Sequence, residues 1–118
     1  MSILVDINGT IASEGKPISK TIDYLKTVTE DIYLISGSHE SLRKRYINLM
    51  DGLDIVYKEI ILNPIDDNKD YQFKLAMAQT IPNLTLAIDN NPTVLSLYRS
   101  VGILAISPDD LNTLGDCS

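Results

Sequence analysis

Five short apolar runs, each ending in a polar turn, alternate with helix-like segments along this 118-residue chain. Runs that are almost continuously apolar are typical of strands buried on both faces, as in a parallel sheet covered by helices on each side. We therefore predict a single three-layer α/β domain over residues 1–118, with a five-stranded parallel sheet. The expected strands are residues 3–5, 32–35, 55–62, 84–88 and 103–106.

The segments between these runs carry the start and stop signals of helices. Ser19 is the expected N-cap of the first helix, Pro92 suits the first turn of the fourth, and Gly102 fits its C-cap. The third strand is the most polar, because of residues 57–59, so we place it near an edge of the sheet. The expected helices are residues 19–30, 38–50, 69–80 and 92–100, with a short helix after Pro108.

The composition argues against several classes of protein. A net charge of −6 disfavours non-specific binding to nucleic acid and to anionic membranes. No apolar run approaches the roughly 20 residues of a membrane-spanning helix, and no charged start leads into an apolar signal segment. The only cysteine, Cys117, has no partner for an intramolecular disulfide, which fits a reducing compartment. We expect a cytoplasmic protein with no membrane partner.

Polar residues of chemical interest follow three of the expected strands. Asp6 leads into the turn at residues 8–10, the Ser36-Gly37-Ser38 segment follows the second strand, and Asp89 follows the fourth. Because the carboxyl ends of parallel strands meet at one edge of a sheet, we expect these residues to lie together. A buried carboxylate must be paired or coordinated, and two carboxylates with a carbonyl oxygen make a suitable Mg²⁺ site.

Each of these motifs also has a purely structural interpretation. Asp and Asn are common turn residues, so on residue type alone the Asp6 segment is as consistent with a turn as with a site. Taken alone, Ser36 and its neighbours fit a helix cap better than a phosphate-binding loop. A phosphate site also needs a cation, and both Lys69 and Lys74 are available for it. We favour Lys69, because the start of a helix after the third strand opens toward the other strand ends.

The ordered set of Asp6 to Thr10, Ser36, Lys69 and Asp89 resembles the four motifs of the haloacid dehalogenase (HAD) superfamily, whose first motif is Asp-x-Asp-Gly-Thr. The resemblance extends over about residues 2–107. It implies a Rossmann-like sheet with strand order 3-2-1-4-5, in which Asp6 and Asp89 flank the switch point where ligands bind. Residues 86–102 look most like the phosphatase domain of bacteriophage polynucleotide kinase/phosphatases, which points to a viral or prophage source.

The resemblance implies an Mg²⁺-dependent phosphatase or phosphotransferase. Asp6 would be the nucleophile that forms an aspartyl-phosphate. Asn8 would stand at the general acid/base position and offer its backbone carbonyl to the metal. Asp89 would hold the metal as well, with Asn90 helping through metal-bound water.

The remaining roles that the resemblance implies concern the phosphate. Thr10, Ser36 and Gly37 would bind it, and Lys69 would clamp it and stabilise charge during transfer. Only seven loop residues, 11–17, follow the first strand, so neither they nor the loop before Lys69 can form a cap domain. In the family, an uncapped site suits large substrates, such as a phosphoprotein or a polynucleotide end, or relies on homo-oligomerisation for closure. A phosphorylated small molecule is the third partner that we keep open.

The chain departs from the family pattern at three positions. Asn8 replaces the second Asp of the first motif, Ser38 replaces the Arg of the phage Ser-Gly-Arg motif, and Asn90 replaces another Asp. An amide cannot exchange a proton as a carboxyl can, and losing a general acid/base typically costs ~10² to 10⁴ in rate. The chain is then a slow phosphatase, a binding or regulatory protein that keeps the pocket, or a variant engineered to trap a complex.

Two other classes fit part of the pattern. A receiver-like phosphoacceptor domain also combines an aspartate with Mg²⁺ in a doubly wound sheet. Such domains place the acceptor Asp at the end of the third strand, where this chain has Asn63-Pro64. An α/β protein that only binds partners is the other alternative. His39 and the basic residues 43–45 are best interpreted as a helix first turn and a solvated helix face.

Overall fold

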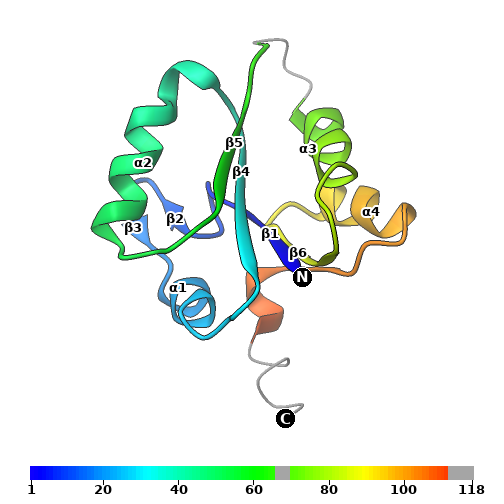
Figure 1. Ribbon diagram of the computed structural model, residues 1–118, viewed down its shortest axis with the longest axis horizontal. Coiled ribbons are helices and arrows are strands. Elements are labelled where there is room, and N and C mark those ends of the chain that lie inside the picture. The colour runs from blue at the N-terminus through cyan, green and yellow to red at the C-terminus, as the bar shows by residue number, and fades with distance from the viewer. Residues whose placement is uncertain (66–69, 112–118) are drawn as a thin grey trace.

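The sheet is built from five parallel strands in the order β5-β4-β1-β6-β7 (Figure 1). This is the order 3-2-1-4-5 along the predicted strands, so the expected fold class and strand order are confirmed. The computed structural model describes residues 1–65 and 70–111. The strands are β1 (Ser2–Asp6), β4 (Asp31–His39), β5 (Glu59–Asn63), β6 (Leu84–Ile88) and β7 (Ala105–Ile106).

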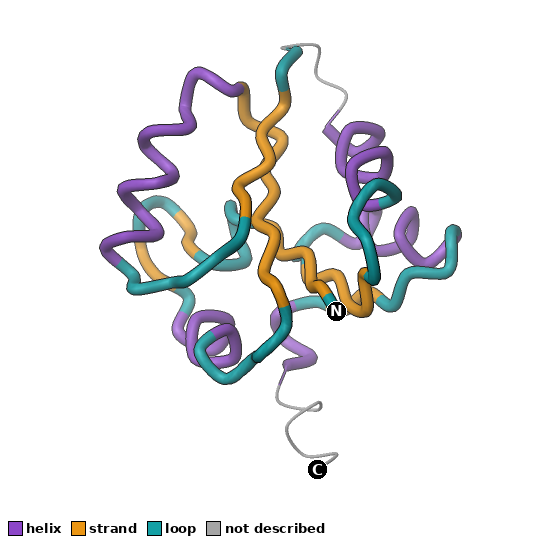
Figure 2. The backbone as a smooth tube through the Cα atoms, in the orientation of Figure 1, coloured by secondary structure: helices purple, strands orange, loops and turns teal. Residues whose placement is uncertain are grey.

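Helices cover both faces of the sheet, which forms the middle layer in Figure 2. Helices α1 (Ser19–Leu25) and α2 (Arg43–Gly52) pack on one face, and α3 (Asp70–Ala78) and α4 (Pro92–Ser100) pack on the other. The two cores use alternate strand residues: Ile3 and Val5 face α1 and α2, whereas Leu4 faces α3 and α4. Burial on both faces explains why the strands are continuously apolar. The described residues also contain two short 3₁₀ helices, η1 (Glu40–Leu42) and η2 (Pro108–Asp110).

The segment after β1 forms a small antiparallel ribbon and no cap domain. Strands β2 (Ala12–Ser13) and β3 (Lys16–Pro17) pair across a two-residue turn. Glu14 and Gly15 both have positive φ angles, of 52° and 78°, as a type I′ hairpin turn requires. The ribbon leaves the carboxyl edge of the sheet uncapped.

Several predicted boundaries were wrong. Helix α1 begins after Ile18 with no side-chain cap and ends at Leu25, so Ser19 is not its N-cap. The helix stops early because the β-branched Thr27, Val28 and Thr29 disfavour its continuation. The second strand runs on to His39, which pairs with Asn63 of β5, so no helix starts at position 38.

The third predicted strand is the outermost strand of the sheet, as expected, but it starts at Glu59 and not at position 55. The Arg43 side chain, held by the carboxylate of Glu40, donates a hydrogen bond of 2.7 Å to the backbone carbonyl of Ile60 on this strand. Arg43 is therefore a structural residue of the β5 edge.

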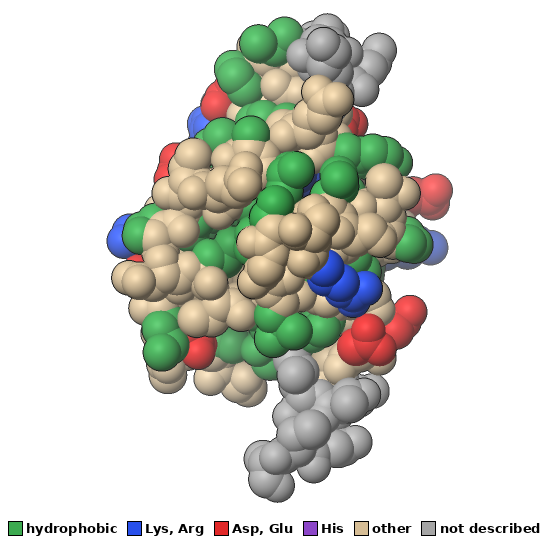
Figure 3. All heavy atoms as spheres, turned by 90° about the vertical axis from the view of Figure 1, so that its right-hand side faces the viewer, with side chains coloured by type: hydrophobic (Ala, Val, Ile, Leu, Met, Phe, Trp, Pro, Cys, Tyr) green, Lys and Arg blue, Asp and Glu red, His purple; other side chains and the backbone are tan. Residues whose placement is uncertain are grey.

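On the face that carries α3 and α4, the Lys and Arg side chains are isolated among apolar and acidic ones (Figure 3). Among the described residues on this face, the Lys and Arg side chains form no continuous track for a nucleic-acid backbone. None of the helices in residues 1–65 and 70–111 has the length and apolar character needed to cross a membrane.

Candidate active site

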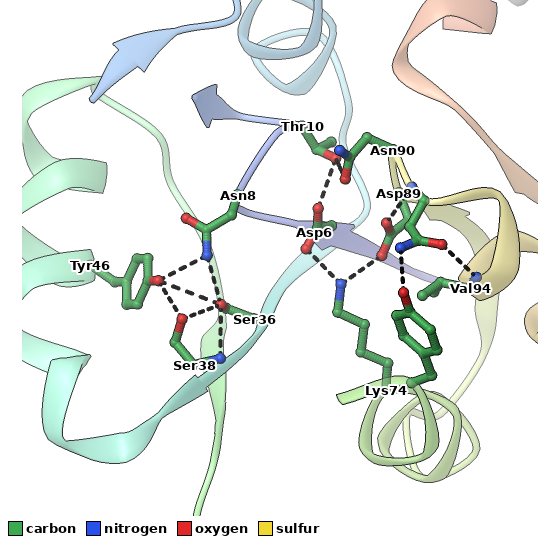
Figure 4. A network of polar contacts seen from close by, with 12 residues as sticks. Asp6, Asn8, Thr10, Ser36, Ser38, Tyr46, Lys74, Asp89, Asn90 and Val94 are labelled. Atoms are coloured by element: carbon green, nitrogen blue, oxygen red, sulfur yellow. Dashed lines mark hydrogen bonds and ion pairs between the residues drawn. The ribbon is translucent and has the colours of Figure 1, made fainter. Parts of the chain in front are cut away.

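Three charged side chains meet where β1 and β6 end (Figure 4). The Lys74 ammonium lies 2.8 Å from Oδ1 of Asp6 and 2.9 Å from Oδ2 of Asp89. Both carboxylates are almost fully buried, at 3% and 0% exposure, and Lys74 is 8% exposed. Two carboxylates share one ammonium, so the cluster keeps a formal charge of −1 away from bulk solvent and favours a further cation.

The environment shifts the proton affinities of this cluster. Burial raises the pKa of Asp6 to about 6; the attraction of Lys74 offsets part of this rise, and the Asp89 carboxylate adds to it. Burial lowers the pKa of Lys74, but the two carboxylates outweigh burial, and the pKa rises overall. Lys74 therefore stays charged at neutral pH.

Thr10 and Asn90 surround the second oxygen of Asp6. The Thr10 hydroxyl donates to Oδ2 of Asp6 at 3.0 Å. The Asn90 amide lies 2.9 Å from the same oxygen and 3.2 Å from the backbone carbonyl oxygen of Asn8. With its nitrogen toward them, this amide donates two hydrogen bonds; with its oxygen toward them, three oxygens converge on one point.

This convergence fits a hard divalent cation. The Asp6 carboxylate, the Asn8 carbonyl and the amide oxygen of Asn90 are ligands that Mg²⁺ accepts, and Asp89 lies beside them. Within the described residues, no group of three or more His, Cys, Asp or Glu side chains is placed to hold a metal ion. The donor set therefore fits the Mg²⁺ that the sequence predicted, and the presence of the metal itself stays a prediction.

Gly9 makes the approach of Asn90 possible. Gly9 has a φ of +81°, and a Cβ atom there would lie 2.4 Å from the Asn90 side-chain nitrogen. Both the turn after β1 and the space above it therefore require glycine.

A second polar cluster, made of hydroxyl groups, lies beside the first (Figure 4). The amide nitrogen of Asn8 donates to Oγ of Ser36 at 3.0 Å and to the Tyr46 hydroxyl at 2.9 Å. The Ser38 hydroxyl lies 2.8 Å from that of Tyr46. Burial raises the pKa of Tyr46, but the hydrogen bonds with Ser36, Ser38 and Asn8 lower it by more. The Asn8 side chain thus points toward α2 and away from Asp6.

The expected site residues divide between the two clusters. Asp6, Thr10, Asp89 and Asn90 lie together, and Asn8 links them to Ser36. The lysine at the carboxylates is Lys74, the alternative that the sequence left open. Lys69, which we favoured, lies outside the described residues. A lysine one turn into α3 has a side chain long enough to reach back to the strand ends.

Gly37 has a packing role that the sequence did not predict. A Cβ atom at Gly37 would lie 2.5 Å from Cγ of Asp70, so this glycine lets the start of α3 approach β4. His39 caps η1 through its ring nitrogen, consistent with the structural interpretation. Tyr46 was missed as a site residue because a tyrosine at helical spacing predicts only a core position.

No protein-family model matches this chain, and no curated protein does either. Several solved chains share its fold, including the following two. A chain in a structure of the Pnkp1/Rnl/Hen1 complex matches with a TM-score of 0.81 and 14% identity, over 90% of this chain and 45% of that chain. A chain in a structure of the Pnkp1/Rnl/Hen1 RNA repair complex matches with a TM-score of 0.74 and 14% identity, over 90% and 41%.

These likenesses establish the fold and nothing finer, because the identity is only 14%. The chain spans less than half the length of either neighbour. By fold and site, the protein is an uncapped three-layer α/β domain with a buried Asp–Lys–Asp cluster at the switch point of its sheet.

Proposed function

We propose that the protein is an HAD-type phosphatase or phosphotransferase that depends on Mg²⁺ and acts through an aspartyl-phosphate on Asp6. The observation that carries the proposal is the contact of one buried lysine, Lys74, with two carboxylates, Asp6 and Asp89, at 2.8 and 2.9 Å. Buried charge clusters at the carboxyl edge of an α/β sheet are typical of ligand sites. A structural ion pair needs only one carboxylate, and here there are two.

In this mechanism a carboxylate oxygen of Asp6 attacks the phosphorus of a phosphomonoester. A bond forms between this oxygen and phosphorus while the bond to the ester oxygen breaks. Lys74 stabilises the charge of the transferring group. Mg²⁺, held by Asp6, Asp89, the Asn8 carbonyl and Asn90, supplies neutralisation of the phosphate charge when it is bound.

Asn8 determines how the leaving group is protonated. Its amide cannot give up a proton, so the leaving alkoxide takes its proton from water. Water later attacks the aspartyl-phosphate without help from a carboxylate at position 8. Turnover is therefore slow, and esters with good leaving groups are the better substrates.

The substrate that we propose is a polynucleotide end. Three observations support this choice: the neighbouring structures belong to an RNA repair complex, the sheet edge carries no cap, and the ribbon at residues 12–17 is too small to enclose a substrate. The net charge of −6 disfavours binding along the backbone of a long polynucleotide, so the terminal phosphate must provide the recognition.

A second function is that of a phosphate-binding protein without turnover. It is favoured by one observation, the Asn8 amide, which uses both of its N–H groups on Ser36 and Tyr46 and has no acid to offer. The pocket would then bind a phosphorylated partner and release it unchanged.

Phosphate release from p-nitrophenyl phosphate with Mg²⁺ tests the proposal. We expect slow release by the native protein and none by Asp6→Ala or Asp89→Ala. Asp51→Ala, which removes an exposed carboxylate on α2, is the matched control and should behave as the native protein. Release that survives both site substitutions would contradict the enzyme assignment, and Mg²⁺ binding without any release would favour the binding protein.

A further inference from the structure

A groove that the proposed chemistry does not use lies between the edge strand β5 and helix α3. It has a volume of about 520 Å³ and is lined mainly by apolar side chains. We call it the β5–α3 groove and define it by Glu59, Ile61, Ile65, Phe73 and Met77. None of the three charged residues at the candidate active site lines it, so the groove is a separate feature of the surface.

The apolar part of the groove combines a fixed floor with an exposed rim. Ile61 is 6% exposed and belongs to the core beneath α3 and α4. Phe73 and Met77, four residues apart on α3, are half-buried and pack against the same core. Ile65 at the rim is 61% exposed, which leaves apolar surface that a partner can cover. Methionine adapts its shape to apolar partners and is common on surfaces that bind them.

One carboxylate gives the groove its electrostatic preference. Arg43 and Glu40 also lie at the groove, but two hydrogen bonds join them, and Arg43 donates a third to the Ile60 carbonyl. The exposed Glu59 carboxylate forms no ion pair in the part of the chain that the structure describes. The groove is therefore negative, on a protein with a net charge of −6, and it favours a cationic partner.

The strand edge restricts the conformation of that partner. An extended segment would add to β5 through main-chain hydrogen bonds, and Arg43 occupies the Ile60 carbonyl at 2.7 Å. A helix satisfies its own backbone hydrogen bonds and binds an apolar groove through side chains alone. The groove thus suits a helix better than a strand. A second copy of the chain is disfavoured, because two molecules that each carry a net charge of −6 repel each other.

We propose that the β5–α3 groove binds an amphipathic, basic helix of a partner protein. The apolar side chains of this helix pack against Phe73 and Met77 and cover Ile65. A Lys or Arg that flanks them pairs with Glu59. This interaction surface is independent of the proposed phosphatase chemistry and adds a docking function to the domain.

Peptides of about 15 residues, long enough to form a helix, test the proposal. The probe has leucine at i, i+3, i+4 and i+7 spacing and lysine elsewhere. One comparison peptide has glutamate in place of lysine, and another alternates leucine and lysine as a strand would. Titrations followed by the Ile and Met methyl NMR signals of the protein give the location and the affinity. We expect saturable shifts at Ile61, Ile65 and Met77 with the probe, and binding of both comparison peptides that is weaker by about tenfold or more.

Two pairs of variants separate the groove from general charge attraction. Glu59→Lys and Asp51→Lys change the net charge equally, but Asp51 lies on α2 outside the groove. We expect only Glu59→Lys to weaken binding further, by about fivefold beyond the loss in Asp51→Lys. Ile65→Glu should weaken binding by about tenfold, whereas Val56→Glu, at an exposed apolar residue outside the groove, should not. Circular dichroism verifies that each variant is folded, and phosphate release should be the same in all four.

Equal losses in Glu59→Lys and Asp51→Lys, or an unchanged affinity in Ile65→Glu, would overturn the proposal. The absence of saturable binding of the probe would do the same. Tighter binding of the alternating peptide would assign the groove to a strand, and methyl shifts that follow the protein concentration alone would assign it to a second copy. Either result contradicts a basic helix as the occupant.

Discussion

The negative charge of Asp6 is unfavourable where it lies. Its side chain is buried next to the Asp89 carboxylate, and the two carboxylates share one cation, Lys74. The cost is expressed in its pKa, which burial raises from 3.8 to about 6. A buried, ionised Asp6 lowers the stability of the folded protein, although the proposed chemistry needs this carboxylate. Natural active sites commonly combine lower stability with function in this way.

The first prediction concerns Asp6 and pH, in EDTA. Between about pH 4 and pH 6 the folded protein keeps the Asp6 proton that the unfolded chain has lost, so the free energy of unfolding falls as pH rises through this window. The full loss is about 3 kcal/mol. Asp6→Asn should therefore be more stable than the native protein by ~1–3 kcal/mol at pH 8. Urea unfolding should show little difference at pH 4, and an equal difference at both values would contradict the burial argument.

The second prediction concerns Asn8. Asn8→Asp supplies a carboxyl at the acid/base position and should raise turnover of an alkyl phosphate by ~10² or more. The gain with p-nitrophenyl phosphate should be smaller, because its leaving group needs little protonation. Steady-state rates for the two esters provide the measurement. An unchanged rate for both would mean that more than the acid/base is missing from the pocket.

Among the elements, the number and order of the strands were predicted well, and several boundaries of both strands and helices less well. The apolar runs of β1, β4 and β6 carry their own signal, since both of their faces are buried. The last residues of β4 are polar, and only their pairing with β5 keeps them in the sheet. Such pairing depends on residues far apart in the sequence, so no local pattern could show it.

The turn after β1 gives the third prediction. Gly9→Ala should destabilise the protein by ~2 kcal/mol or more, because it combines a positive φ with a clash at Asn90. Gly15→Ala is the matched control, with a φ of +78° and nothing within 4 Å of the added Cβ, so it should cost only about 1 kcal/mol. Thermal unfolding of both variants measures the difference. Equal costs would show that Asn90 is not held against this turn.

For the whole molecule, the carboxylates of the candidate site could be predicted and its cation and hydroxyl cluster could not. Asp6 and Asp89 follow apolar strands, and topology alone brings such strand ends together. Choosing between Lys69 and Lys74 depends on where α3 begins and on how far a lysine reaches. Tyr46 contacts Asn8 from α2, which lies on the face of the sheet opposite to α3 and Lys74. No spacing in the sequence indicates this contact.

The fourth prediction concerns Mg²⁺ and the stability of the whole fold. A cation that binds only the folded state stabilises it by about 1.4 kcal/mol at ten times its dissociation constant. Mg²⁺ should therefore raise the melting temperature of the native protein, and EDTA should reverse the rise. Asp89→Asn should abolish this response, while Asp51→Ala should keep it. A response in Asp89→Asn equal to the native one would place the metal elsewhere.

The edge strand β5 bears on how this protein behaves at high concentration. An exposed strand edge is a template on which other chains can add strands and grow into fibres. Arg43 occupies the Ile60 carbonyl of β5 and places a charged group where an incoming strand would have to pair. The Arg43 guanidinium thus disfavours the addition of a strand to β5. Its removal would leave the Ile60 carbonyl free to pair with a strand of another molecule.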